Sequence, residues 1–109
     1  MLKIALVLAT LTGTTMEHGV ASMYSVASNG GTTVACPGYK LSDHDFVFAH
    51  RTAPCGAQAW ITYNGQSVLA VCIDRGPFVH GRIIDLGVAT ARAIGLPGLG
   101  TVTVEWLRR

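Results

Sequence analysis

Five ionisable side chains lie within residues 74–85 of a chain in which only 13% of residues are charged. In chain order they are Asp74, Arg75, His80, Arg82 and Asp85. An apolar, strand-forming run at 67–73 leads into this stretch, and Arg-Gly-Pro follows its first carboxylate. That pattern predicts a carboxylate held at a sheet edge beside a tight, rigid turn. We expect a functional site here.

Asp74 is the candidate catalytic acid. Cleaving a glycosidic bond requires a carboxylic acid near the leaving oxygen. Because Asp74 follows an apolar strand, partial burial is expected to raise its pKa and keep a proton available. The alternative is a turn carboxylate that caps backbone amides beside Gly76. The residues alone leave both interpretations open.

Two more residues have competing interpretations. His50 ends the apolar run 46–49, where a histidine serves either in a site or as a core residue with satisfied hydrogen bonds. Asp85 stands between apolar residues, so once buried it needs a partner. Arg82 or Arg75 is the expected partner, in a structural ion pair.

Length and composition limit the fold and the partners. A chain of 109 residues with 13 glycines and four prolines suits one small all-β or α+β domain. The net charge of +2 is too small to argue nucleic-acid binding. Cysteine and histidine spacings do not fit a zinc site, so we expect no metal and no cofactor.

The expected elements are short strands joined by tight turns. Asn64-Gly65 between runs 57–63 and 66–73 is the clearest hairpin signal. Alanine-rich residues 88–94, stopped by Gly95, predict a helix. Further strands are expected at 19–25, 32–35, 46–50, 82–86 and 101–107. Together they predict a small closed barrel of about six strands with one helix.

The first 18 residues resemble a signal peptide. Lys3 supplies a positive start, and residues 4–11 form an apolar run too short to span a bilayer. The alternative is a first strand or helix of the domain. We expect residues 1–18 to be the leader and 19–109 the domain. The product is expected to be periplasmic or secreted and monomeric, without a stable membrane anchor.

Cysteine usage agrees with export. Cys36 and Cys55 both lie in turn contexts next to proline and glycine, where a bridge would staple a long loop. Cys72 lies inside an apolar strand and is expected to be a buried free thiol. Three pairings are possible in principle, and the Cys36–Cys55 disulfide is the favoured one.

Three segments carry a resemblance to a known family. They are GVASMY at 19–24, FAHRTAPCG at 48–56 and DRGPFVHGRIIDL at 74–86. In this order, with the hairpin between the second and third, they resemble the rare lipoprotein A family. The resemblance covers nearly everything after the leader. It implies a six-stranded double-psi β-barrel, the fold of expansin-type domains.

The resemblance also implies an activity. Members of that family are periplasmic lytic transglycosylases that act on peptidoglycan glycan strands lacking peptide stems. They cleave between N-acetylmuramic acid and N-acetylglucosamine without water and leave a 1,6-anhydro sugar. By this resemblance Asp74 is the acid and base, and His50 is the second site residue. Arg75 and Arg82 then contact substrate or hold Asp74 and Asp85 in place.

The chain departs from the family pattern in one important stretch. Many members carry a glutamate shortly before the histidine segment, whereas this chain has VACPGY at 34–39. Tyr39 stands about where that glutamate is expected, and Asp43 or Asp45 is a possible substitute. This difference favours a second hypothesis, a non-catalytic, expansin-like barrel that binds wall polysaccharide. A third is a secreted defence or effector protein of barwin-like type.

Overall fold

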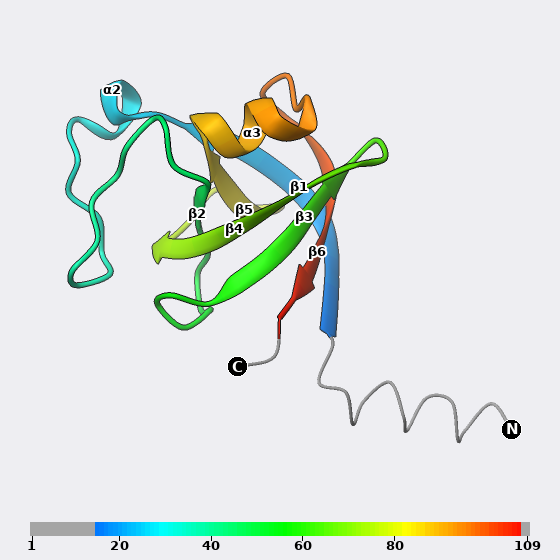
Figure 1. The fold of residues 1–109 in the computed structure, drawn as a ribbon, viewed down its shortest axis with the longest axis horizontal. Helices are drawn as coiled ribbons and strands as arrows, with labels where there is room; N and C mark the ends of the chain where they lie inside the picture. Colours follow the sequence, from blue (N-terminus) through cyan, green and yellow to red (C-terminus); the bar gives the residue numbers. More distant parts are fainter. Residues whose placement is uncertain (1–14, 108–109) are drawn as a thin grey trace, which may run out of the picture.

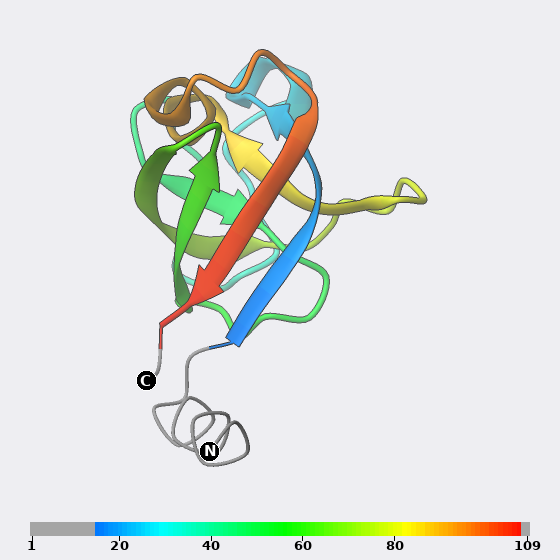
Figure 2. The ribbon, with the colours of Figure 1, turned by 90° about the vertical axis from the view of Figure 1, so that its right-hand side faces the viewer.

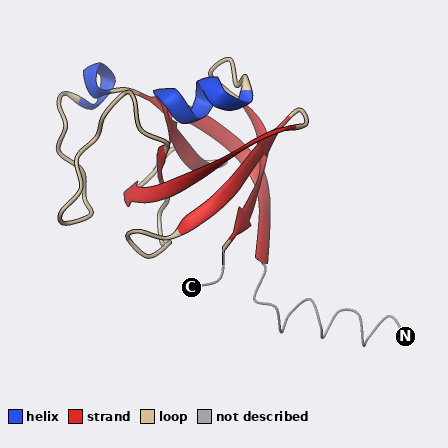
Figure 3. Ribbon diagram, in the orientation of Figure 1, coloured by secondary structure: helices blue, strands red, loops and turns tan. Residues whose placement is uncertain are grey.

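The computed structural model describes residues 15–107, and in this part of the chain six strands close into a barrel (Figures 1 and 3). Neighbouring strands follow the order β1-β5-β2-β4-β3-β6. The strands are β1 (Thr15–Tyr24), β2 (Val47–Ala49), β3 (Gln58–Tyr63), β4 (Gln66–Asp74), β5 (Arg82–Gly87) and β6 (Gly100–Trp106). The helices are α2 (Val26–Asn29) and α3 (Val88–Ile94). The predicted closed barrel is confirmed, and the one-turn helix α2 is an addition to it.

Two parallel pairings make the barrel mixed. β1 runs parallel to β5 and β2 runs parallel to β4, whereas the other four contacts are antiparallel. Parallel neighbours need long connections, because a tight turn joins only antiparallel strands. The short strand β2 lies between β4 and β5, which carry the two carboxylates of the 74–85 stretch.

The core follows from alternation along the strands. In β6, Val102 and Val104 are at most 1% exposed, and the residues between and beside them face outward. Phe48 on β2 pairs with Leu86 on one side and with Cys72 on the other, and all three are fully buried. The inside of the barrel is therefore filled by side chains and leaves no open channel.

The predicted hairpin is confirmed at Asn64-Gly65. Tyr63 pairs with Gln66, so the loop has two residues, and both have positive φ, 50° and 84°. This is the type I′ geometry that Asn-Gly favours. The strand expected at 32–35 is wrong: only one isolated bridge forms there, between Thr33 and Lys40.

Helix α3 occupies the predicted residues and lies across one end of the barrel, whereas β1 begins and β6 ends at the other (Figure 1). It starts after Gly87 without a side-chain cap and ends at Gly95 in the left-handed conformation. A Cβ on Gly87 would lie only 3.0 Å from Cγ2 of Val47, so the absence of a side chain lets α3 approach β2. Thr90 then donates a hydrogen bond to the Val47 carbonyl.

The first strand begins earlier than expected. β1 starts at Thr15, and residues 15–18 pair with residues 103–106 of β6. The predicted leader, 1–18, thus overlaps the barrel by four residues, and its remainder lies outside the described residues. Within 15–107, no helix is long and apolar enough to cross a bilayer.

Candidate active site

The register places Asp74 and Asp85 on either side of the same residue. Ala49 of β2 pairs with Asp74 on β4 and with Asp85 on β5. A register shift between Phe48 and Ala49 interrupts the regular pairing with β4 just before Asp74. Such bulges re-aim side chains at the ends of strands. The sheet therefore brings together two carboxylates that are 11 positions apart in the chain.

Three donors hold the Asp74 carboxylate. The Tyr24 hydroxyl donates to Oδ2 at 3.2 Å. The backbone N–H groups of Ala35 and Arg75 both donate to Oδ1 at 2.9 Å. The side chain is half-buried and set as a hydrogen-bond acceptor from three separate segments. Its capping of local amides, which the sequence left as an alternative, is therefore part of how it is positioned.

Tyr24 serves Asp74 as a hydroxyl donor. Burial raises the pKa of Tyr24 well above its ordinary value, and the negative charge of Asp74 and their hydrogen bond raise it further. The charge of Asp85 adds to the same effect. The phenol therefore keeps its proton over the whole physiological range of pH.

Asp85 is the carboxyl group with a raised pKa. Burial raises it, while a 3.2 Å hydrogen bond from the Ser22 hydroxyl and the positive charge of Arg82 oppose the shift without cancelling it. The charge of Asp74 contributes to the increase, which places the two carboxyl groups within electrostatic reach of each other. The raised pKa suits Asp85 to hold a proton and to donate it.

The expected ion pair of Asp85 with an arginine is not formed. Among residues 15–107, the one contact within 4.0 Å between a basic and an acidic side chain joins His50 and Glu17. Arg82 is three residues before Asp85 on β5, and a register shift against β1 falls between them, where the pairing passes from Arg82 directly to Ile84. Arg82 affects Asp85 through its charge alone.

Arg75 fixes a loop and does not pair with a carboxylate side chain. Its guanidinium donates to the carbonyl oxygens of His50 and Ala53 and to Sγ of Cys55, the first at 3.0 Å and the last at 3.4 Å. These contacts hold loop 50–55 against the end of β4. The expected fixing role for Arg75 therefore applies to this loop.

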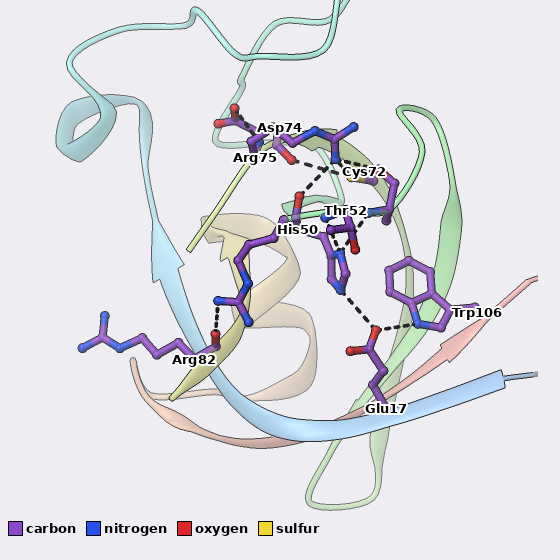
Figure 4. Close-up of polar contacts among 10 residues, drawn as sticks. Glu17, His50, Thr52, Cys72, Asp74, Arg75, Arg82 and Trp106 are labelled. Atoms are coloured by element: carbon purple, nitrogen blue, oxygen red, sulfur yellow. Dashed lines mark hydrogen bonds and ion pairs between the residues drawn. The ribbon is translucent and has the colours of Figure 1, made fainter. Parts of the chain in front are cut away.

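His50 points away from Asp74. Its Nδ1 accepts hydrogen bonds from the backbone N–H groups of Thr52 and Ala53, at 3.2 and 3.0 Å. Its Nε2 lies 3.1 Å from Oε1 of Glu17. Figure 4 shows the imidazole ring directed toward Glu17 and the Asp74 carboxylate directed away from it. The two side chains expected to act together therefore face different partners, Glu17 for His50 and Tyr24 for Asp74.

The pocket beside His50 has a volume of about 400 Å³ and does not include Asp74. It is lined by Glu17, His50, Thr52, Ala53, Pro54, Ala57, Trp106 and Leu107. Glu17 was missed from the sequence because the expected leader included it. The polar pair Glu17 and His18, six residues beyond the end of the apolar run 4–11, was the available signal that the barrel had already begun.

Tyr39 and Asp43 do not take the place of the family glutamate beside Asp74. Tyr39 is 41% exposed and lies over Gly56, where an added Cβ would be 2.9 Å from its hydroxyl. Asp43 accepts a hydrogen bond from the backbone N–H of Val26, at the start of α2. Neither contacts Asp74 or Asp85 through a hydrogen bond.

Both cysteine predictions are confirmed. Cys36 and Cys55 form a disulfide, and Cys72 is a buried free thiol whose pKa burial raises. The disulfide joins loop 50–55 to the segment that supplies the Ala35 N–H to Asp74. No group of three or more histidine, cysteine or acidic residues within 15–107 is arranged to hold a metal ion.

The family comparison gives a clear result for nearly the whole described chain. Residues 16–106 match a family model described as lytic transglycolase. The chain belongs to this family. The resemblance to rare lipoprotein A is confirmed, and with it the double-psi β-barrel fold.

Similarity to individual proteins supports the same family membership. The chain is 40% identical over 96 residues to the endolytic peptidoglycan transglycosylase RlpA of Pasteurella multocida, covering 84% of this chain and 32% of that protein. It is 39% identical over 94 residues to a probable endolytic peptidoglycan transglycosylase RlpA of Synechocystis sp., covering 83% and 29%. The chain thus spans about a third of the relatives it matches.

Solved structures support the fold alone. A Streptomyces papain inhibitor superposes with a TM-score of 0.66 at 20% identity, covering 86% of this chain and 96% of that one. An expansin of Clavibacter michiganensis gives the same TM-score at 21% identity, covering 86% and 51%. At these identities the likeness concerns the barrel and not its chemistry.

Proposed function

We propose that this barrel is a lytic transglycosylase domain that cleaves peptidoglycan glycan strands. One observation carries the proposal: Asp85, a partly buried carboxyl with a raised pKa, lies within electrostatic reach of Asp74, which three donors hold as an acceptor. Such a pair provides both a proton donor and a proton acceptor. Membership of the lytic transglycolase family and the names of the relatives support the same activity.

In this proposal the two carboxyl groups divide the proton transfers. Asp85 gives its proton to the glycosidic oxygen as the bond from that oxygen to C1 of N-acetylmuramic acid breaks. The C6 hydroxyl oxygen of the same sugar then bonds to C1, and its proton passes to Asp74. The products are a 1,6-anhydro-muramyl end and a free hydroxyl on the neighbouring sugar. Water is not consumed, and solvent returns the proton from Asp74 to Asp85.

His50 has a positioning role in this account. Its Nδ1 binds two amides of the loop that Arg75 also holds, and the backbone N–H of Arg75 is one of the three donors to Asp74. His50 therefore acts on Asp74 through the backbone around it. The enzyme and its substrate would meet outside the cytoplasm, because a disulfide persists in an oxidising compartment. We place the end of the leader before Thr15, where β1 begins.

A second candidate function is glycan binding without cleavage. The absence of the family glutamate from residues 34–39 is the observation that favours it. The two functions differ in whether covalent bonds are broken, and one experiment separates them.

The experiment follows peptide-stripped peptidoglycan glycan by sedimentation, which reports binding, and by release of soluble sugar, which reports cleavage. We expect the wild-type protein to bind and to release sugar. Asp74→Asn should bind and release little, whereas Glu105→Gln, a control on β6, should match the wild type. Binding without release by the wild type would favour the second function, and neither binding nor release would overturn both.

A further inference from the structure

The pocket beside His50 is separate from the two carboxyl groups proposed for catalysis. It opens where β1 begins and β6 ends, between Glu17 and Trp106, and neither Asp74 nor Asp85 lines it. Figure 2 shows these strand ends side by side at one end of the barrel. A cavity of about 400 Å³ has room for a small organic group.

A carboxylate is held rigidly in this pocket. Oε1 of Glu17 accepts a hydrogen bond from Nε1 of Trp106 at 2.9 Å and lies 3.1 Å from Nε2 of His50 (Figure 4). Two bonds from separate elements fix the orientation of the group before any ligand arrives. Such preorganisation reduces the entropic cost of binding.

The negative charge of Glu17 has no permanent cation beside it. Because Nδ1 of His50 faces two backbone N–H groups, the ring proton is on Nε2 and the imidazole donates to Glu17 as a neutral group. The Trp106 indole is a neutral donor as well. In the described part of the chain, no lysine or arginine lies within 4.0 Å of this carboxylate.

The other walls are mostly apolar. Ala53, Pro54, Ala57 and Leu107 surround the carboxylate together with the indole ring. An anion at the side of an apolar, aromatic pocket suits a ligand with a cationic head and an apolar stem. The alkyl stem packs on the walls, and the ammonium group pairs with Glu17 at the indole.

We propose that this pocket binds a primary ammonium carried on an unbranched alkyl chain, as in a lysine-type side chain. The site is separate from the two proposed catalytic carboxyl groups, because its ligand would contact Glu17 and Trp106 and neither Asp74 nor Asp85. A wall peptide and a partner protein both offer this chemistry. The pocket would give the barrel a second point of attachment beside its glycan site.

The test is an NMR titration of the full chain with n-butylammonium, and with n-butanol as the uncharged probe of similar shape. We expect saturable shifts of the Trp106 indole N–H and of the Thr52 and Ala53 amides with butylammonium, at least tenfold weaker with butanol. Glu17→Gln keeps a hydrogen-bond acceptor and removes the charge, so it should weaken butylammonium binding at least tenfold. Glu105→Gln, the control on β6, should bind like the wild type.

Three results would overturn the proposal. They are equal affinity for butanol and butylammonium, no saturable shift with either probe, and equal weakening by Glu17→Gln and Glu105→Gln. If Glu17→Gln does not fold, the comparison of the two probes on the wild type decides alone. Release of sugar from peptide-free glycan by the wild type, measured with and without n-butylammonium, separates this site from catalysis, since cleavage without the amine does not depend on amine binding.

Discussion

At the scale of one residue, folding changes the pKa of the Asp85 carboxyl group. In water its carboxyl group ionises freely, whereas in the barrel burial raises its pKa and a single hydroxyl, from Ser22, donates to it. Folding therefore favours the protonated form. The same environment that makes Asp85 a proton donor makes its ionised form costly.

Replacing Asp85 should separate stability from activity. Because the pKa of Asp85 is raised in the folded state, its protonated form supports folding at acid pH, and that support is lost as pH rises through the folded pKa. Asp85→Asn should therefore be more stable than the wild type at pH 7, and the difference should vanish below the ordinary pKa of 3.8. Thermal unfolding at several pH values measures this.

The same variant should lose glycan cleavage by about a hundredfold to ten-thousandfold, the usual contribution of a general acid. A variant that is less stable at pH 7 would contradict the assignment of a buried, poorly compensated carboxylate. A variant that keeps full activity would assign the proton donation to another group.

The disulfide acts at the scale of elements. It closes a loop between residues 19 positions apart and ties the donor segment of Asp74 to loop 50–55. Replacing Cys36 and Cys55 together by serine should lower the free energy of unfolding by about 3 kcal/mol. Cleavage should fall as well, because the Ala35 amide is released from Asp74.

Denaturant unfolding with and without reductant measures the effect of the disulfide. Reductant should lower the stability of the wild type and leave that of the double variant unchanged. The double variant is therefore the control for effects of reductant that do not involve the disulfide. Equal stability of the oxidised wild type and the double variant would show that the loops are held by other contacts.

Helix α3 depends on one buried hydroxyl. Thr90 is fully buried, and its Oγ1 donates to the Val47 carbonyl at 2.9 Å. Thr90→Val keeps the shape and leaves that carbonyl without this donor, so we expect a loss of roughly 1–3 kcal/mol in unfolding free energy. Thr101→Val, on the exposed face of β6, is the matched control and should change stability by less than about 0.5 kcal/mol. Equal effects of the two would contradict the role of the buried bond.

Local signals explain which elements were predictable from the sequence. The Asn64-Gly65 turn and helix α3 are determined by neighbouring residues, and both occur as predicted. The direction of the His50 ring depends on amides of its own loop and on Glu17, 33 positions away. No local pattern specifies such a contact, so the expected pairing of His50 with Asp74 could not be checked from sequence.

At the scale of the whole molecule, the first strand closes the barrel. Residues 15–18 pair with the end of β6, and Glu17 contributes hydrogen bonds to His50 and Trp106. A domain starting at Thr15 should therefore be more stable than one starting at Gly19 by at least about 2 kcal/mol, given the hydrogen bonds lost. Denaturant unfolding of the two truncated chains measures the difference. Equal stability of the two chains would show that residues 15–18 do not contribute to the stability of the barrel.

The central claim is that the barrel cleaves glycan without water, and product mass tests it most directly. Peptide-stripped peptidoglycan glycan is incubated with the protein in water enriched in oxygen-18, beside Asp85→Asn. The account predicts anhydro-muramyl ends that carry no heavy oxygen and that are nearly absent with the variant. Reducing ends that carry oxygen-18 would identify a hydrolase and contradict the claim.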